Sequence, residues 1–155
     1  MEYKLRIESP NVIMEPMLAL LEDAEHVPLQ ISGNSMSPFL VHGRDTVYLS
    51  KPRLPLKKGD MVLYQRTNGA YVLHRIQHVT GDSYTMVGDA QVQLEPGICC
   101  NQIRAVVTAV RRKDKLLQKG NFWWDFFEKV WICIIPLRRP IIKLYSIVCP
   151  SHKKA

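Results

Sequence analysis

The stretch Ile31-Ser-Gly-Asn-Ser-Met-Ser-Pro-Phe-Leu40 is the segment around which the rest of the chain is organised. Gly33 tolerates backbone angles that other residues resist, and Pro38 fixes its own φ, so the segment predicts a tight turn. Ser35 stands at the bend, and apolar neighbours return the chain to the core: Met36, Phe39 and Leu40. A nucleophile requires an exposed oxygen on a rigid backbone with free N–H groups beside it. The same string also fits an ordinary surface turn, so its meaning depends on the rest of the chain.

The composition is that of a globular protein of one domain. The chain has 155 residues, of which 46% are apolar and 23% charged, a balance that supports a core and excludes a disordered chain. Its formal net charge is +7, which favours nucleic acid or an anionic membrane surface as a partner. Much of the positive charge follows residue 110, beside a dense aromatic and aliphatic segment. We therefore expect a membrane surface as partner, and no nucleic acid.

The cysteines predict neither a metal site nor another cofactor. Cys99, Cys100, Cys133 and Cys149 include no C-x-x-C spacing, and the adjacent pair is a poor disulfide candidate. We expect reduced thiols and a location at the cytoplasmic face of a membrane. The first ten residues contain no secretory signal, and no stretch approaches the roughly 20 apolar residues that span a bilayer.

Short runs rich in β-branched and aromatic residues dominate the middle of the chain. They predict strands at 27–31, 46–50, 60–64, 71–76, 83–87 and 103–110, separated by turn signals, among which Asn68-Gly69 is the strongest hairpin signal. An amphipathic helix is predicted over residues 11–25. The expected fold is mainly β: a curled antiparallel sheet or partly closed barrel, with an N-terminal helix and a C-terminal apolar helical segment.

The composition of the sequence changes near Lys119-Gly120, after which aromatic and aliphatic residues predominate. Residues 122–135 are helical and apolar nearly all round, Pro136 breaks this run, and a second apolar stretch covers 141–149. Two interpretations are open: a helix that covers a face of the sheet, or in-plane attachment to a membrane surface through residues 122–149. In the second, which we prefer, aromatic side chains lie at the headgroup level and basic side chains lie beside anionic lipid. These residues are Trp123, Trp124, Phe126, Phe127 and Trp131, with Arg138, Arg139, Lys143, Lys153 and Lys154.

A serine hydroxyl needs a general base, and His74 is the candidate. It lies in the run Tyr71-Val-Leu-His-Arg-Ile76, where a hairpin strand holds it rigidly. Its neutral form can take the Ser35 proton if the fold brings the two within hydrogen-bond reach. An acid that orients the imidazole completes such a site. Asp89 is our choice for this acid, and Glu95 is its rival.

Five boxes occur in one order along the chain: Gly33-Asn-Ser-Met-Ser-Pro-Phe-Leu40, Gly43-Arg-Asp45, Gly59-Asp-Met-Val-Leu-Tyr64, Val72-Leu-His-Arg-Ile76 and Gly88-Asp89. Together they resemble the type I signal peptidases and the related self-cleaving SOS repressor domains. Five boxes in register are far more specific than any one of them alone. The resemblance divides the chain into an N-terminal helical segment (1–26), a signal peptidase-like catalytic domain (27–112) and the C-terminal segment (121–155).

The resemblance implies a serine endopeptidase that cleaves leader or signal peptides from precursor proteins. Ser35 is the implied nucleophile and His74 the implied base, at a position where the bacterial enzymes carry lysine and the endoplasmic-reticulum and archaeal-type enzymes carry histidine. Asp89 matches the family's Gly-Asp box, and Glu95 falls near a second acid of that family. The substrate is expected to add as an extended strand along residues 27–34. Contacts to the substrate or the oxyanion are expected from Gly33, Asn34 and Met36, besides the backbone N–H of Ser35.

Other functions stay open at this point. The chain is also consistent with a non-catalytic peptide-binding or regulatory module on the same fold. Self-cleavage is a further hypothesis, although we expect no DNA-binding helix-turn-helix before the domain, and no Ala-Gly or Cys-Gly pair stands before Ser35. The N-terminal membrane helices usual among signal peptidases are not expected here. Lys57 and Lys58 are alternative bases, which we expect to be solvated.

Overall fold

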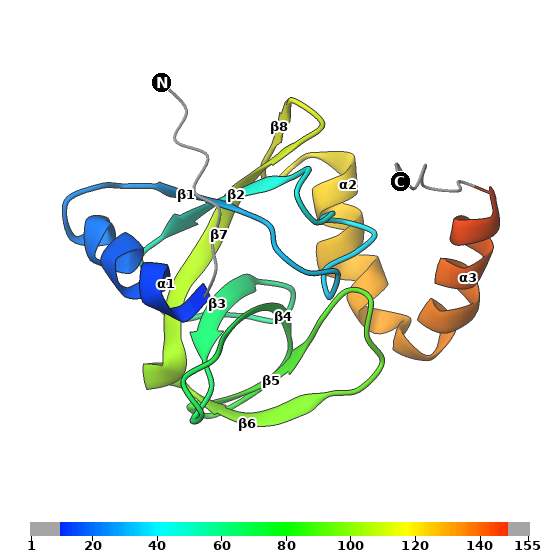
Figure 1. Ribbon diagram of the computed structural model, residues 1–155. Coiled ribbons are helices and arrows are strands. Elements are labelled where there is room, and N and C mark those ends of the chain that lie inside the picture. The colour runs from blue at the N-terminus through cyan, green and yellow to red at the C-terminus, as the bar shows by residue number, and fades with distance from the viewer. Residues whose placement is uncertain (1–9, 149–155) are drawn as a thin grey trace.

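The computed structural model describes residues 10–148, which form a mixed α/β fold built on one open antiparallel sheet (Figure 1). Its eight strands follow the order β1-β2-β7-β3-β4-β5-β6, with β8 paired to β7. The strands are β1 (Val27–Gln30), β2 (Thr46–Ser50), β3 (Met61–Gln65), β4 (Tyr71–Thr80), β5 (Ser83–Val87), β6 (Glu95–Cys99), β7 (Ile103–Arg112) and β8 (Lys115–Leu117). The α-helices are α1 (Pro10–Ala19), α2 (Phe122–Asp125) and α3 (Arg138–Val148); a π turn (Phe126–Val130) continues α2, and 3-10 turns cover Leu20–Glu22, Cys100–Gln102, Trp131–Cys133 and Ile135–Leu137.

All six strands predicted from the sequence are confirmed. The Asn68-Gly69 turn joins β3 to β4 as an antiparallel hairpin, and Gly69 has a φ of +87°, which glycine adopts without strain. The sequence analysis missed β6 because Pro96 and Gly97 are unusual in a strand and occur here at the edge of the sheet. It missed β8 because three residues are too few to show alternation.

The expected curl or partial closure of the sheet is wrong, because the sheet is open. Its two edges are β1 and β6, which would have to pair for the sheet to close. β1 has only four residues, and Pro96 removes one backbone donor from β6. The antiparallel sheet and the helices at both ends of the chain are confirmed, and the class is mixed α/β rather than mainly β.

The N-terminal helix lies on the opposite side of the sheet from the C-terminal helices in the view of Figure 1. It was predicted over residues 11–25; α1 ends at Ala19, and a 3-10 turn continues it to Glu22. Met14, Leu18 and Leu21 are buried in the main core. Apolar side chains at a spacing of three to four residues therefore anchor this helix.

The C-terminal segment packs on the domain over its first half. α2 begins at Phe122, where the Asn121 side chain accepts a hydrogen bond from Trp123 N at 3.0 Å. Phe39 of the Ser35 loop contacts Trp124 and Phe127, with ring centroids 6.2 and 4.9 Å apart. The buried apolar side chains of this half are Trp124, Phe127, Trp131 and Ile132. Packing on the domain is therefore what the structure shows for Trp124, Phe127 and Trp131, whereas Trp123, which was also predicted at the headgroup level, is exposed.

The second half of the segment contacts the domain through fewer side chains, among them the buried Arg138 and the partly buried Ile142. α3 stands apart from the sheet in Figure 1, and most of its side chains are exposed. Within residues 10–148, none of the helices has both the length and the apolar character that a membrane-spanning helix requires. Cys149, Lys153 and Lys154, which the sequence analysis assigned to this region, lie outside the described residues.

Candidate active site

Ser35 lies in the loop between β1 and β2, and buried hydrogen bonds close the base of this loop. The fully buried Asp45 carboxylate accepts hydrogen bonds from Val41 N at 2.9 Å and from the Arg44 guanidinium at 2.7 Å. Ile31 N donates to Asp45 O, and Gly43 N donates to Ile31 O, each at 2.9 Å. Because its two ends are tied to each other, the loop presents Ser35 on a fixed backbone.

The turn around Ser35 leaves the N–H groups of Ser35 and Met36 without an acceptor among the described residues. Gly33 N is engaged, because it donates to His42 Nδ1 at 2.9 Å. Asn34 is exposed and contributes its carbonyl to a turn hydrogen bond. Of the three residues predicted to contact the substrate or oxyanion, Asn34 and Met36 therefore each have a backbone donor without an acceptor among the described residues, and Ser35 supplies another.

His74 lies on β4 opposite Val62 of β3 and is only 3% exposed. It lines a cavity of about 300 Å³ together with Ser35. The remaining walls include the turn residues 31–33 and the start of β4. Within the described part of the chain no hydrogen bond joins the Ser35 hydroxyl to the imidazole. A general base must lie within about 2.6–3.2 Å of the hydroxyl oxygen that it deprotonates when substrate is bound. In structures without substrate this distance is often longer.

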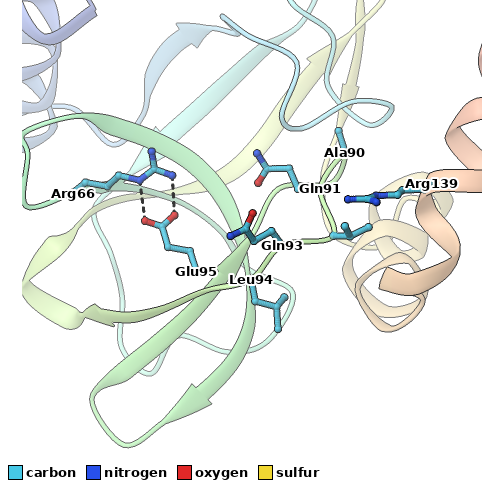
Figure 2. Close-up of a pocket in the computed structure, with 8 residues that line it drawn as sticks. Arg66, Ala90, Gln91, Gln93, Leu94, Glu95 and Arg139 are labelled. Carbon is cyan, nitrogen blue, oxygen red and sulfur yellow. Dashed lines mark hydrogen bonds and ion pairs between the residues drawn. The ribbon is translucent and has the colours of Figure 1, made fainter.

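A chain of side chains holds the His74 imidazole from the side of Nδ1. Tyr64 Oη lies 3.2 Å from His74 Nδ1 and donates to Glu95 Oε2 at 2.6 Å. Arg66 donates to both oxygens of Glu95 at 2.8 Å (Figure 2). Tyr64 has one hydroxyl hydrogen, which it gives to the carboxylate, so its bond to His74 requires the proton on Nδ1. Nε2 is then unprotonated, as a general base requires.

The electrostatic environment of His74 keeps its imidazole neutral. Burial lowers the pKa of His74 from its ordinary value of 6.5 to about 4, and the nearby Glu95 charge offsets part of that effect. The guanidinium of Arg66 lowers the pKa of Glu95, so this carboxylate is ionised at neutral pH. Within residues 13–148, two buried side-chain polar atoms have no hydrogen-bond partner: Arg112 Nε and Trp124 Nε1. His74 Nε2 is not among them and has no protein partner there, so it is open to the cavity.

Asp89, our first choice for the acid, binds a different partner. It is fully buried, and Arg75 Nε and Nη2 donate to its two oxygens at 3.0 and 2.9 Å. His74 and Arg75 are consecutive on β4 and therefore point to opposite faces of the sheet. Asp89 acts on His74 only as a nearby charge that raises its pKa. The carboxylate connected to His74 through hydrogen bonds is Glu95, the rival candidate.

The Gly88-Asp89 box contacts Ser35 rather than His74. Ala90 N donates to Ser35 O at 2.9 Å. A Cβ atom on Gly88 would lie 2.6 Å from the same oxygen, closer than real Cβ atoms approach. Asp89, held by Arg75, therefore keeps a glycine-containing loop packed directly against the backbone of the candidate nucleophile.

The C-terminal segment holds this loop from behind. Trp131 Nε1 donates to Asp89 O at 2.8 Å. Arg138 Nη1 donates to Gly88 O at 2.8 Å and to Gln91 O at 2.9 Å. The sequence analysis placed Trp131 at the headgroup level and Arg138 beside anionic lipid, but both side chains are buried in the protein. They support the site instead.

Sequence reasoning missed Tyr64, although a signal for it was present. The Asn68-Gly69 hairpin pairs Tyr64 with Val72, which puts Tyr64 diagonally across from His74 on one face of the sheet. Arg66 and Arg138 carry no comparable signal, because their partners are far away in the sequence. The alternative bases, Lys57 and Lys58, are exposed and do not line the Ser35 cavity.

No group of three or more His, Cys, Asp or Glu side chains among the described residues is arranged to hold a metal ion. Cys99, Cys100 and Cys133 are free thiols. Comparison of the chain with family models, with curated proteins and with solved structures finds no match. A functional assignment therefore depends on the geometry around Ser35 and His74.

Proposed function

We propose that this protein is a serine endopeptidase of the signal peptidase type, with Ser35 as nucleophile and His74 as general base. One observation carries the proposal: Ser35 and His74 line the same cavity, and Tyr64 and Glu95 hold the imidazole in the tautomer that leaves Nε2 free. The order of the five sequence boxes supports the same assignment. Glu95 takes the orienting role, and Asp89 positions the loop beneath Ser35.

In the proposed reaction, His74 Nε2 takes the proton of Ser35 Oγ while Oγ attacks the carbonyl carbon of the scissile bond. The N–H groups of Ser35 and Met36 donate to the oxyanion. The imidazolium gives its proton to the departing amine as the C–N bond breaks, which leaves an acyl group on Ser35. Water then loses a proton to the same nitrogen and attacks the acyl carbon. The bond between this carbon and Ser35 Oγ breaks, the imidazolium returns its proton to Oγ, and the acid is released. Glu95, acting through Tyr64, stabilises the imidazolium in both halves of the reaction.

The substrate of this proposal is an extended leader or signal peptide. Residues 71–74 of β4 pair with β3 on one side, whereas β5 pairs with β4 only from Arg75 onward. This leaves an open strand edge beside the cavity, across from the turn residues 31–33. A peptide laid along such an edge gains main-chain hydrogen bonds that do not depend on its side chains.

We also propose that α3 attaches the protein to an anionic membrane surface, at the cytoplasmic face. Leu144, Ile147 and Val148 are exposed by 62, 67 and 69%, and Lys143 lies on the same helix in a chain of net charge +7. An amphipathic helix with basic residues lies in the plane of such a surface. Replacing Leu144 and Ile147 by aspartate should abolish co-sedimentation with phosphatidylserine vesicles. Sedimentation equal to that of the wild type would contradict this attachment.

The test of the peptidase compares protein N-termini, by mass spectrometry of terminal peptides, in source cells carrying wild type, Ser35→Ala or Ser37→Ala. Ser37 is the matched control, because it is a half-buried serine in the same turn. We expect particular mature N-termini to vanish, and longer precursors to accumulate, only with Ser35→Ala. Identical N-termini in all three, with the variants folded and expressed, would favour a non-catalytic peptide-binding module. The missing hydrogen bond between Ser35 and His74 is the observation that keeps that module as the second candidate.

A further inference from the structure

A second cavity opens beside the Ser35 cavity (Figure 2). Its volume is about 540 Å³, and Arg66 and Gln91 line both cavities. The loop between β5 and β6 forms one wall, and Arg139 of α3 reaches in from the other side. A peptide that places its scissile bond at Ser35 therefore has neighbouring side chains within reach of the second cavity.

The second cavity has a positive charge that its own carboxylate does not offset. Glu95 lines the wall, but Arg66 binds both of its oxygens at 2.8 Å. Arg139 has no ion pair among residues 13–148. Behind the wall, the buried Arg138 guanidinium is bonded to backbone carbonyls, including that of Gln91. The uncompensated charges on this side of the site are therefore positive.

The fold holds the polar groups of this cavity in place. Arg138 ties the first turn of α3 to the loop at Gly88 O and Gln91 O, and Arg139 projects from that anchored turn. The side-chain oxygen of Gln91 accepts a hydrogen bond from Gly88 N at 3.3 Å. Its NH₂ group keeps two donors for another partner. An anionic ligand in the cavity thus meets a guanidinium and an amide donor.

We propose that the second cavity is a specificity pocket for an acidic side chain, Asp or Glu, of the peptide substrate, with Arg139 as its charged contact. The inference rests on the proposed function, because it names the residue class that the peptidase selects near its cut. A guanidinium suits this role since it binds a carboxylate through two parallel hydrogen bonds. Arg139 is exposed, so solvent screening limits the preference to about two- to fivefold over a neutral residue.

The test uses the purified full-length protein and a mixture of synthetic peptides, acetylated at the N-terminus and amidated at the C-terminus, with the cuts identified by mass spectrometry. The wild type should enrich Asp and Glu at one position relative to the cut. Arg139→Glu should reverse the preference towards Lys and Arg, and Arg139→Lys should keep it in weaker form. Lys115→Glu, an equal change of charge at an exposed residue of β8, is the control and should keep the wild-type selectivity.

The outcomes separate this inference from the proposed function. Cleavage without acidic enrichment, or enrichment that survives in Arg139→Glu, would overturn the specificity pocket and leave the peptidase standing. A second mixture with free C-termini tests the other source of a carboxylate. Enrichment that appears only in that mixture would show that the cavity binds the chain end, and would overturn recognition of an acidic side chain. No cleavage of any peptide by the wild type would overturn the proposed function and this inference with it.

Discussion

The Tyr64→Phe substitution removes one oxygen atom and with it the link between Glu95 and His74. The hydroxyl bonds Glu95 at 2.6 Å and lies 3.2 Å from His74 Nδ1. Its loss leaves a buried N–H without a partner, which costs about 1–3 kcal/mol of stability. It also separates the transition-state imidazolium from its carboxylate. A hydrogen bond to a charged group contributes about 1.5–3 kcal/mol, so we expect Ser35 to react about 10- to 100-fold more slowly.

Two measurements check this prediction without knowledge of the substrate. The first is the rate at which a fluorophosphonate modifies Ser35, followed by intact mass. The second is ¹⁵N NMR of labelled histidine, in which the wild type should show His74 protonated at Nδ1 and not at Nε2, and the variant should show a mixture. Tyr48→Phe is the matched control, because the Tyr48 ring packs under Arg111 and its hydroxyl has no side-chain partner in the described part of the chain.

The NMR signal distinguishes positioning from stability, since a protein that is merely less stable would keep its tautomer while folded. If Tyr64→Phe reacts at the wild-type rate and keeps the Nδ1–H tautomer, the hydrogen-bond chain has no part in activating His74. If Tyr64→Phe reacts more slowly but keeps the Nδ1–H tautomer, Tyr64 does not fix the orientation of the ring. Glu95 would then act on His74 through its charge alone.

Four further predictions concern the buried groups. Because burial lowers the pKa of His74 to about 4, modification of Ser35 by the fluorophosphonate should stay constant from pH 7 to about 5 and fall to half near pH 4. The unfolded chain binds the His74 proton near pH 6.5, so the free energy of unfolding should fall by about 3 kcal/mol as the pH drops from 6.5 to 4. Urea denaturation should show this fall in wild type and not in His74→Gln. Asp89→Asn leaves the Arg75 charge buried and unpaired and should cost about 3–5 kcal/mol in urea; a cost below 1 kcal/mol would contradict the buried pair. Gly88→Ala should slow modification of Ser35, because the added carbon meets Ser35 O at 2.6 Å; an unchanged rate would show that the loop does not position the nucleophile.

The strands and the Ser35 turn could be predicted because their signals are local. Alternating apolar residues and the Asn68-Gly69 turn define β3 and β4, and Met36, Phe39 and Leu40 enter the core as their pattern indicates. The sequence does not show that the sheet remains open, because strand pairing at its edges depends on contacts between distant segments. The short, proline-containing edge strands became informative only when their places in the sheet were known.

The choice between Asp89 and Glu95 could not be made from spacing. Both follow β5 in the sequence. Asp89 matches the Gly-Asp box of the family that the sequence resembles, and Glu95 falls near a second acid of that family. What separates them is that consecutive residues on β4 face opposite ways, so Arg75 binds Asp89 on one face while Glu95 reaches His74 through Tyr64 on the other. A tyrosine between the acid and the imidazole is visible only when the hairpin register and β6 are both known.

The C-terminal segment shows the same limit. A run that is aromatic and apolar nearly all round is typical both of a buried helix and of a membrane interface. Contacts with Phe39 and with the carbonyl of Asp89 make the first half part of the core. These contacts join segments that are far apart in the sequence. The proposed membrane attachment depends on α3, where most apolar side chains are exposed, although Phe122 and Trp123 of the first half are exposed as well.

Covalent labelling of the purified protein by a fluorophosphonate, with the modified residue located by peptide mass spectrometry, tests the central claim most directly. We expect one adduct, on Ser35, with none on folded Ser35→Ala and a much slower reaction in His74→Gln. Labelling of Ser35→Ala at the wild-type rate, or no adduct on Ser35 in the folded wild type, would contradict the assignment of Ser35 as a nucleophile activated by His74.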